Sequence, residues 1–124
     1  MEFFRTVEVE TNQTQIRERI NFETIPDIYP DMVVLGGEGN VFQIGSFWGE
    51  FMLQRDEIMG GIRFSMLDCP NAIAWTITTG YPPARNKVVI HLTINRLEKP
   101  REFLSEINEL LDGWVKGLEE TFIK

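Results

Sequence analysis

The sequence predicts an α+β domain in which a curved antiparallel sheet wraps around one long C-terminal helix. Two observations indicate this fold class. Short segments of alternating apolar residues follow one another with only brief turns between them, which is typical of hairpins. The last 25 residues instead repeat apolar side chains at intervals of three and four, which is typical of an amphipathic helix. At 124 residues, we expect a single domain, residues 1–124.

The N-terminal part of the chain predicts one strand followed by two short helical pieces. Residues 3–9 alternate apolar and polar side chains, so we expect a strand with one face in water. Residues 13–22 fit either a short helix or a strand pairing back on the first. We favour the helix, because Thr11 or Asn12 can cap it and because Pro26 and Pro30 then separate off a second short helical piece around residues 24–29.

The middle of the chain predicts a meander of strands. We expect the glycine-rich residues 36–40 to form a tight turn, residues 45–49 to form a bend or bulge, and the charged residues 55–57 to lie at a solvated hairpin tip. The turns between strands are too short for helical crossovers, so neighbouring strands should be antiparallel. The predicted strands are residues 32–35, 41–44, 51–53, 62–67, 73–78 and 88–95.

The C-terminal segment predicts a long helix that begins near Pro100, where a missing N–H is harmless. Gly113 and Gly117 lie within it, although glycine inside a helix costs about 1 kcal/mol relative to alanine. Either another backbone approaches closely at these positions, or space is left beside the helix, which would favour a cavity. The apolar face comprises Phe103, Leu104, Ile107, Leu110, Leu111, Trp114, Val115, Leu118 and Phe122.

This order of elements resembles the helix-grip architecture of the START-like superfamily, which includes polyketide cyclases, lipid-transfer domains and plant pathogenesis-related allergens. Residues 7–11, followed by a short helix, resemble the family's first strand and helix pair, and residues 36–40 are similar to the glycine-rich loop between the second and third strands of the allergen branch. The final helix, with Trp114 and Leu118, resembles the family's closing helix. The resemblance implies that the sheet curls around this helix and that apolar ligands can sit between them. It implies no catalytic residue.

We therefore expect a ligand cavity between the sheet and the C-terminal helix, on the order of 300 Å³. The expected partner is an apolar small molecule, and no cofactor is expected. Replacement of Gly117 by leucine should fill the cavity and leave the fold intact. The expected lining residues are Phe64, Trp75, Ile77, Ile90, Leu92, Ile107, Leu110 and Trp114.

The charge of the chain suggests a second hypothesis. Nineteen acidic and twelve basic residues give a net charge of −7, and no Lys or Arg lies between Arg19 and Arg55. Such a surface repels a phosphate backbone, so we expect no nucleic-acid partner. The acidic stretch from Glu23 to Glu50 instead suits a basic protein, so the alternative function is an interaction protein of the immunity or inhibitor type.

The remaining sequence features are less specific. No run of about 18 apolar residues is present, so we expect no membrane span. The N-terminus lacks the pattern of a signal peptide, and Cys69 stands alone, so we expect a cytoplasmic protein without an intrachain disulfide or a metal site. His91 is the only histidine and should point outward. A third hypothesis, an enzyme of the cyclase type, would use pocket groups such as Tyr81, Asp68 or Arg85, but we favour a protein without catalysis.

Overall fold

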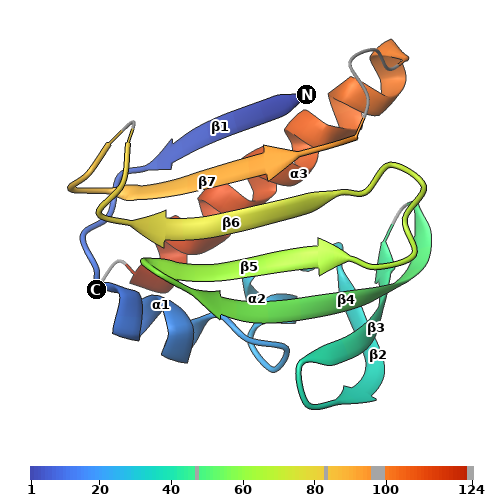
Figure 1. The fold of residues 1–124 in the computed structure, drawn as a ribbon, viewed down its shortest axis with the longest axis horizontal. Helices are drawn as coiled ribbons and strands as arrows, with labels where there is room; N and C mark the ends of the chain where they lie inside the picture. Colours follow the sequence, from blue (N-terminus) through green and yellow to red (C-terminus); the bar gives the residue numbers. More distant parts are fainter. Residues whose placement is uncertain (47, 83, 96–99, 123–124) are drawn as a thin grey trace.

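The computed structural model describes residues 1–46, 48–82, 84–95 and 100–122, and among them it confirms the predicted fold class. Seven antiparallel strands form one sheet in the order β1-β7-β6-β5-β4-β3-β2, and the helices lie on one of its faces (Figure 1). The strands are β1 (Glu2–Val7), β2 (Val33–Glu38), β3 (Val41–Ser46), β4 (Gly49–Ile58), β5 (Gly61–Met66), β6 (Ala74–Thr79) and β7 (Val88–Thr93); the helices are α1 (Gln13–Arg19), α2 (Ile25–Ile28) and α3 (Arg101–Phe122).

The helical interpretation of residues 13–22 is confirmed, and α1 starts as predicted. The Asn12 side chain accepts a hydrogen bond from the Gln15 backbone N–H at 2.9 Å, which satisfies one of the free donors at the helix start. At the other end of α1, Arg55 Nε and Nη2 donate to the carbonyl oxygens of Ile20 and Arg17. Arg55 is therefore a half-buried link between β4 and α1, and its predicted place at a solvated hairpin tip is wrong.

Two predicted turns are also displaced. Gly36 and Gly37 lie inside β2 rather than in a turn, and only residues 39–40 connect β2 to β3. A Cβ on Gly37 would lie 2.6 Å from the Phe42 Cα of the paired strand, so glycine is required by a close approach of two backbones. The expected bend at residues 45–49 falls partly outside the described residues: Gly45 and Ser46 belong to β3, Gly49 begins β4, and these two strands pair antiparallel.

The core lies between the concave face of the sheet and the three helices. Strand register aligns inward-facing side chains in two rows that cross β5, β6 and β7. Because alternate residues of a strand face the same side, each row contributes one side chain per strand to the core. One row is Phe64, Trp75 and Leu92, and the other is Ile62, Ile77 and Ile90, all at most 1% exposed.

Gly113 and Gly117 allow α2 to approach α3 closely. A Cβ on Gly117 would lie 1.9 Å from the Ile28 carbonyl oxygen, and a Cβ on Gly113 would lie 2.5 Å from the Tyr29 ring. The first of the two sequence alternatives, a close backbone approach, is therefore confirmed at Gly117, where the Ile28 carbonyl lies against the helix, and at Gly113 the Tyr29 ring takes the place of a side chain. Both glycines also line a surface depression of about 220 Å³ between α2 and α3, which is not the interior cavity expected under the sheet. The expectation that leucine at position 117 would leave the fold intact is wrong, because α2 already occupies the space beside Gly117.

The same approach buries the Tyr29 phenol. Tyr29 is 5% exposed, and its burial raises the pKa from 10.0 to about 12, with smaller contributions from the negative charges of Asp31 and Glu109. The neutral phenol is the form that this site accommodates. The Tyr29 side chain is therefore uncharged at physiological pH and packs as part of the core.

Replacement of Gly117 by alanine should destabilise the protein, although the same change in an ordinary helix interior stabilises by about 1 kcal/mol. We expect a loss of about 1–3 kcal/mol, because the new Cβ forces α2 away from α3. Urea denaturation measures the change, and Ser105→Ala on the exposed side of α3 is the matched control. A Gly117→Ala variant at least as stable as Ser105→Ala would contradict the close approach.

Stability should fall at alkaline pH through Tyr29. The folded protein keeps the phenol proton up to a pKa of about 12, whereas the unfolded chain releases it near 10.0, so unfolding becomes easier as pH rises through this window. Tyr29→Phe should therefore lose less stability than the parent between about pH 9 and about pH 11, measured by urea denaturation at both values. Equal slopes for Tyr29→Phe and the parent would refute the assignment.

Candidate functional site

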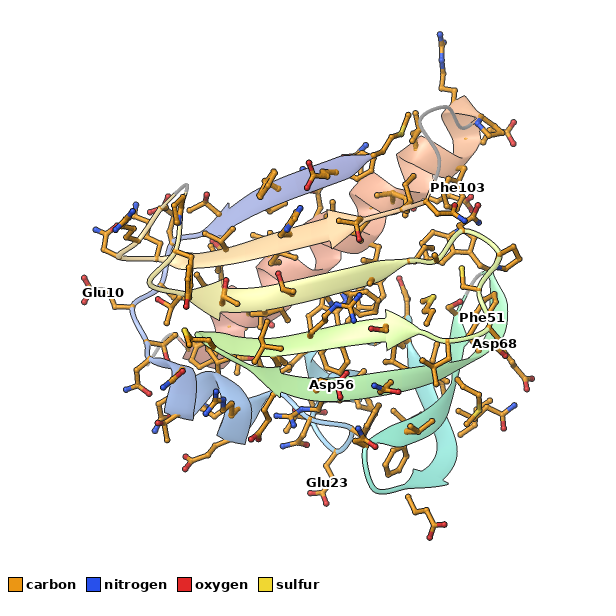
Figure 2. The ribbon with its side chains drawn as sticks, in the orientation of Figure 1. Glu10, Glu23, Phe51, Asp56, Asp68 and Phe103 are labelled. Carbon is orange, nitrogen blue, oxygen red and sulfur yellow. The ribbon has the colours of Figure 1, made fainter. Side chains whose placement is uncertain are left out.

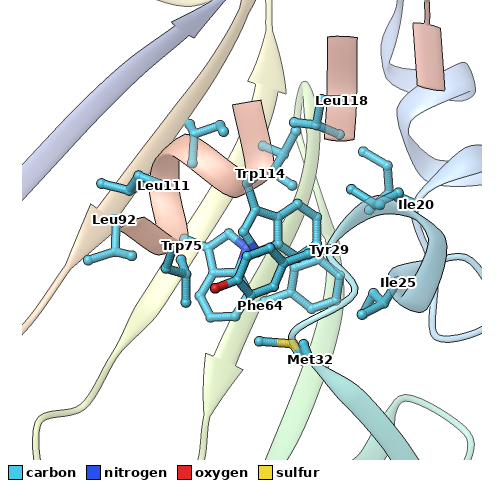
Figure 3. Close-up of a cluster of buried hydrophobic side chains, with 14 of the residues drawn as sticks. Ile20, Ile25, Tyr29, Met32, Phe64, Trp75, Leu92, Leu111, Trp114 and Leu118 are labelled. Carbon is cyan, nitrogen blue, oxygen red and sulfur yellow. The ribbon is translucent and has the colours of Figure 1, made fainter. Parts of the chain in front are cut away.

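The eight residues predicted to line a ligand site do gather in one place. Five come from the sheet and three from α3, and each is at most 1% exposed. Figure 3 shows the centre of this group, where Trp114 of α3 lies beside Phe64 and Trp75 of the sheet. Sheet and helix therefore meet at a continuous apolar layer, as the helix-grip resemblance implies.

Aromatic rings occupy the middle of this layer. The ring centroids of Phe64, Trp75 and Trp114 are 5.4–5.8 Å apart in all three pairs. Tyr29 stacks on Trp114 from the α2 side at 6.1 Å, and Phe22 meets Phe64 edge-on at 6.3 Å. We call Phe64, Trp75, Trp114 and Tyr29 the aromatic cluster. Its rings are in contact, so the layer between sheet and helix is closed in the structure. The ligand cavity expected from the sequence therefore stays a prediction.

Two polar groups in the aromatic cluster have no partner. The indole N–H groups of Trp75 and Trp114 are buried, and neither has a hydrogen-bond acceptor among the described residues. The third tryptophan differs, because Trp48 Nε1 donates to Glu106 Oε1 at 3.2 Å. A buried donor without an acceptor costs about 1–3 kcal/mol, so these two indoles are an unusual feature of an otherwise apolar core. Sequence reasoning located both rings but gave no sign of their unpaired donors.

A surface depression lies elsewhere, at the end of the sheet where α1 begins. It measures about 540 Å³ and contains Tyr81 and Arg85, two of the three groups that the cyclase hypothesis named. Asp68 lies at the opposite end of the sheet from Glu10, and Glu10 adjoins the depression (Figure 2). We call this depression the Tyr81 cleft. Its lining is Thr11, Asn12, Gln13, Met59, Gly60, Thr79, Gly80, Tyr81 and Arg85.

The three cyclase-type residues therefore do not form one catalytic group. Asp68 Oδ1 accepts a hydrogen bond from the Met52 backbone N–H at 3.0 Å, which gives it a structural role in a turn. His91 lies on the outer face of the sheet, stacked on Phe4 with centroids 4.3 Å apart and 2.9 Å from Glu2 Oε1. Its outward direction is as predicted, and it is separated from the aromatic cluster by the sheet.

Two further findings concern the described residues only. No group of three or more His, Cys, Asp or Glu side chains among them is arranged to hold a metal ion. No helix in this part of the chain combines the length and the apolar character needed to cross a membrane.

Comparisons with known proteins give structural neighbours but no sequence relatives. No family model matches the chain, and no curated protein matches it. An uncharacterized protein from Bacillus thuringiensis is similar over 100% of both chains, with a TM-score of 0.66 at 15% identity. The protein XoxI from Bacillus cereus is similar with a TM-score of 0.66 at 16% identity, over 98% of this chain and 94% of that one.

A third solved structure carries a superfamily name. It is a START superfamily protein from Mycobacterium smegmatis, with a TM-score of 0.65 at 13% identity, over 98% of this chain and 96% of that one. The similarity extends over the sheet and the closing helix alike, since nearly the whole of both chains is covered. The chain described here therefore has the START-like, helix-grip fold.

Proposed function

We propose that this protein binds a small, uncharged, apolar ligand that carries a hydrogen-bond acceptor, in the layer between the sheet and α3. The observation that carries the proposal is the pair of buried indole N–H groups of Trp75 and Trp114 without acceptors. The START-like fold supports it, because apolar ligands between sheet and helix are what the superfamily resemblance implies. The proposed site comprises the eight residues predicted from the sequence.

The buried indole N–H groups of Trp75 and Trp114 can form hydrogen bonds only if an acceptor enters the aromatic cluster. Phenylalanine or leucine at positions 75 and 114 would fill an apolar core without a buried donor, whereas tryptophan leaves an N–H that must go unpaired. A ligand oxygen that accepts from an indole removes this cost of about 1–3 kcal/mol per donor. The protein therefore favours an acceptor-bearing guest over a plain hydrocarbon of the same shape.

The surroundings argue for an uncharged ligand. No charged or polar residue is buried among the described residues. The ionisable member of the aromatic cluster, Tyr29, has a pKa raised to about 12, so its phenol is neutral. A carboxylate or ammonium placed here would have no counter-charge, and burial of an unpaired ion is strongly unfavourable. The aromatic faces of Phe64 and Trp114 instead suit a flat ring system.

Binding requires the aromatic cluster to open. The rings are in contact, so a guest enters only when α3 or its side chains move away from the sheet. The α2 side is held by the close approach at Gly113 and Gly117. The other end of the layer, near the start of α3, is closed by side chains: the Trp48 indole bonds Glu106 and meets the Phe103 ring at 5.7 Å. Side chains move more readily than packed backbones, so we propose entry at this end.

The hypothesis of a basic protein partner remains a prediction from the sequence. Its carboxylates, at Glu23, Asp27, Asp31, Glu38 and Glu50, are all exposed. Glu50 already accepts a hydrogen bond from Gln43. Exposure of acidic groups is the ordinary condition of a charged surface, so it does not favour this function over ligand binding.

A matched pair of tricyclic probes tests the ligand proposal. Fluorenone carries a carbonyl acceptor that fluorene lacks, and the two are otherwise similar in shape. We expect fluorenone to shift the indole N–H resonances of Trp75 and Trp114 in ¹H–¹⁵N spectra and to raise the melting midpoint, since any ligand of the native state stabilises it. The Trp48 resonance should move less, because its donor is already paired.

Single Trp→Phe variants assign the three resonances and serve as controls. Trp75→Phe and Trp114→Phe should narrow the preference for fluorenone over fluorene, whereas Trp48→Phe should keep it. Equal binding of the two probes would remove the acceptor argument. Failure of both probes to bind, with unmoved indole resonances, would remove the ligand-binding proposal and leave the two donors to buried water.

A further inference from the structure

The Tyr81 cleft differs from the other depressions of the described surface in its charge. Of its described lining residues only Arg85 is charged. The four other depressions each include at least one carboxylate: Glu23 in one, Glu8 and Glu10 in another, and Asp27 with Glu120 in the remaining two. In a chain with a net charge of −7, a cleft of about 540 Å³ whose charged lining residue is a cation is a local exception, and the carboxylate of Glu10 adjoins the cleft without lining it.

The guanidinium of Arg85 is available to a ligand. No salt bridge or hydrogen bond joins Arg85 to another described residue. The nearby carboxylate of Glu8 is already engaged by Lys87, so it does not compete for Arg85. An unpaired guanidinium presents its donors in a planar fork that matches a carboxylate.

The cleft also offers an apolar surface beside this cation. The Tyr81 ring is 39% exposed and lies over Gly60, where a Cβ would be only 2.5 Å from a ring carbon. Glycine is needed at position 60 for two reasons: its φ of +89° is unfavourable for other residues, and a side chain would collide with the Tyr81 ring. Met59, 79% exposed, lines the same cleft and adds an adaptable apolar contact.

The amide side chains of the cleft add hydrogen-bond donors. Asn12 Oδ1 accepts from the Gln15 N–H, and Gln13 Oε1 accepts from the Gly60 N–H. These bonds use the oxygen of each amide, so the NH₂ groups remain for a guest. Arginine, two amide NH₂ groups and an exposed aromatic ring together suit an anion attached to a flat apolar body.

We propose that the Tyr81 cleft binds a small aromatic carboxylate, with the carboxylate on Arg85 and the ring on Tyr81. This site is separate from the proposed interior site, because its residues lie at the rim of the sheet and the interior cluster takes no charge. The cleft favours a negatively charged ligand, whereas the interior favours an uncharged one.

Two nearly isosteric probes, naphthoate and naphthamide, test the cleft on the full chain. In titrations followed by ¹H–¹⁵N spectra, naphthoate should shift the backbone amide resonances of Gly60 and Gly80. Naphthamide should bind about tenfold more weakly, because a hydrogen bond between charged groups is stronger than one that involves a neutral amide. Arg85→Gln should weaken naphthoate by about tenfold or more and Arg85→Lys by less. Arg63→Gln, at an exposed arginine of β5 outside the cleft, is the matched control and should bind as the parent.

Each other outcome overturns the proposal for the cleft, and only the last of them also contradicts the uncharged ligand proposed for the interior. Equal affinity for the two probes, or equal binding by the Arg85→Gln and Arg63→Gln variants, would show that Arg85 does not recognise the carboxylate. Absence of naphthoate binding would remove the site. Shifts at the indole resonances of Trp75 and Trp114 in place of the Gly60 and Gly80 amides would assign naphthoate to the interior instead.

Discussion

The contact of Trp114 with Phe64 and Trp75 is the interaction on which the rest of the structure depends. It joins the centre of α3 to the centre of the sheet, and all three ring pairs are within 5.8 Å. Beyond the area that they bury, aromatic pairs of this kind contribute about 0.5–1.5 kcal/mol each. Because the apolar face of α3 packs on the sheet at this point, loss of this contact would expose apolar side chains of both layers of the core.

The close packing of α2 on α3 sets which parts of this core can move. Gly117 lets the α2 backbone lie against α3, and Gly113 makes room for the buried Tyr29 ring, so this side is held by a main-chain contact as well as by an aromatic ring. Two arginines fix α1 in a similar way: Arg55 donates to the last carbonyls of α1, and Arg17 Nη2 donates to the Ile58 carbonyl at 2.7 Å. The opening proposed for the layer is therefore at the end near Trp48 and Phe103, where the described contacts are between side chains.

The sequence predicted the fold well because its strongest signals are periodic. The 3.6-residue repeat of α3 and the alternation of β6 and β7 follow from one-sided burial, which sequence records directly. Features set by long-range contacts were missed. Arg55 resembled a tip residue because its acceptors, on α1, are 35 and 38 positions away. Tyr81 and Arg85 could be named but not placed, because their cleft also requires Asn12 and Met59 from distant segments.

The two proposed sites favour different ligands for one physical reason, which is that burial of an unpaired charge is unfavourable. Water and an unpaired arginine stabilise an anion at the rim, whereas the interior offers two neutral donors and no charge. A molecule with both a ring carbonyl and a carboxylate cannot satisfy the two places at once, because its charge would be buried unpaired if the ring entered the aromatic cluster. The net charge of −7 strengthens this division, since anions approach an acidic protein favourably only where the local charge is positive. If both proposals hold, the charge of a ligand, more than its apolar area, decides whether it is held at the rim or inside.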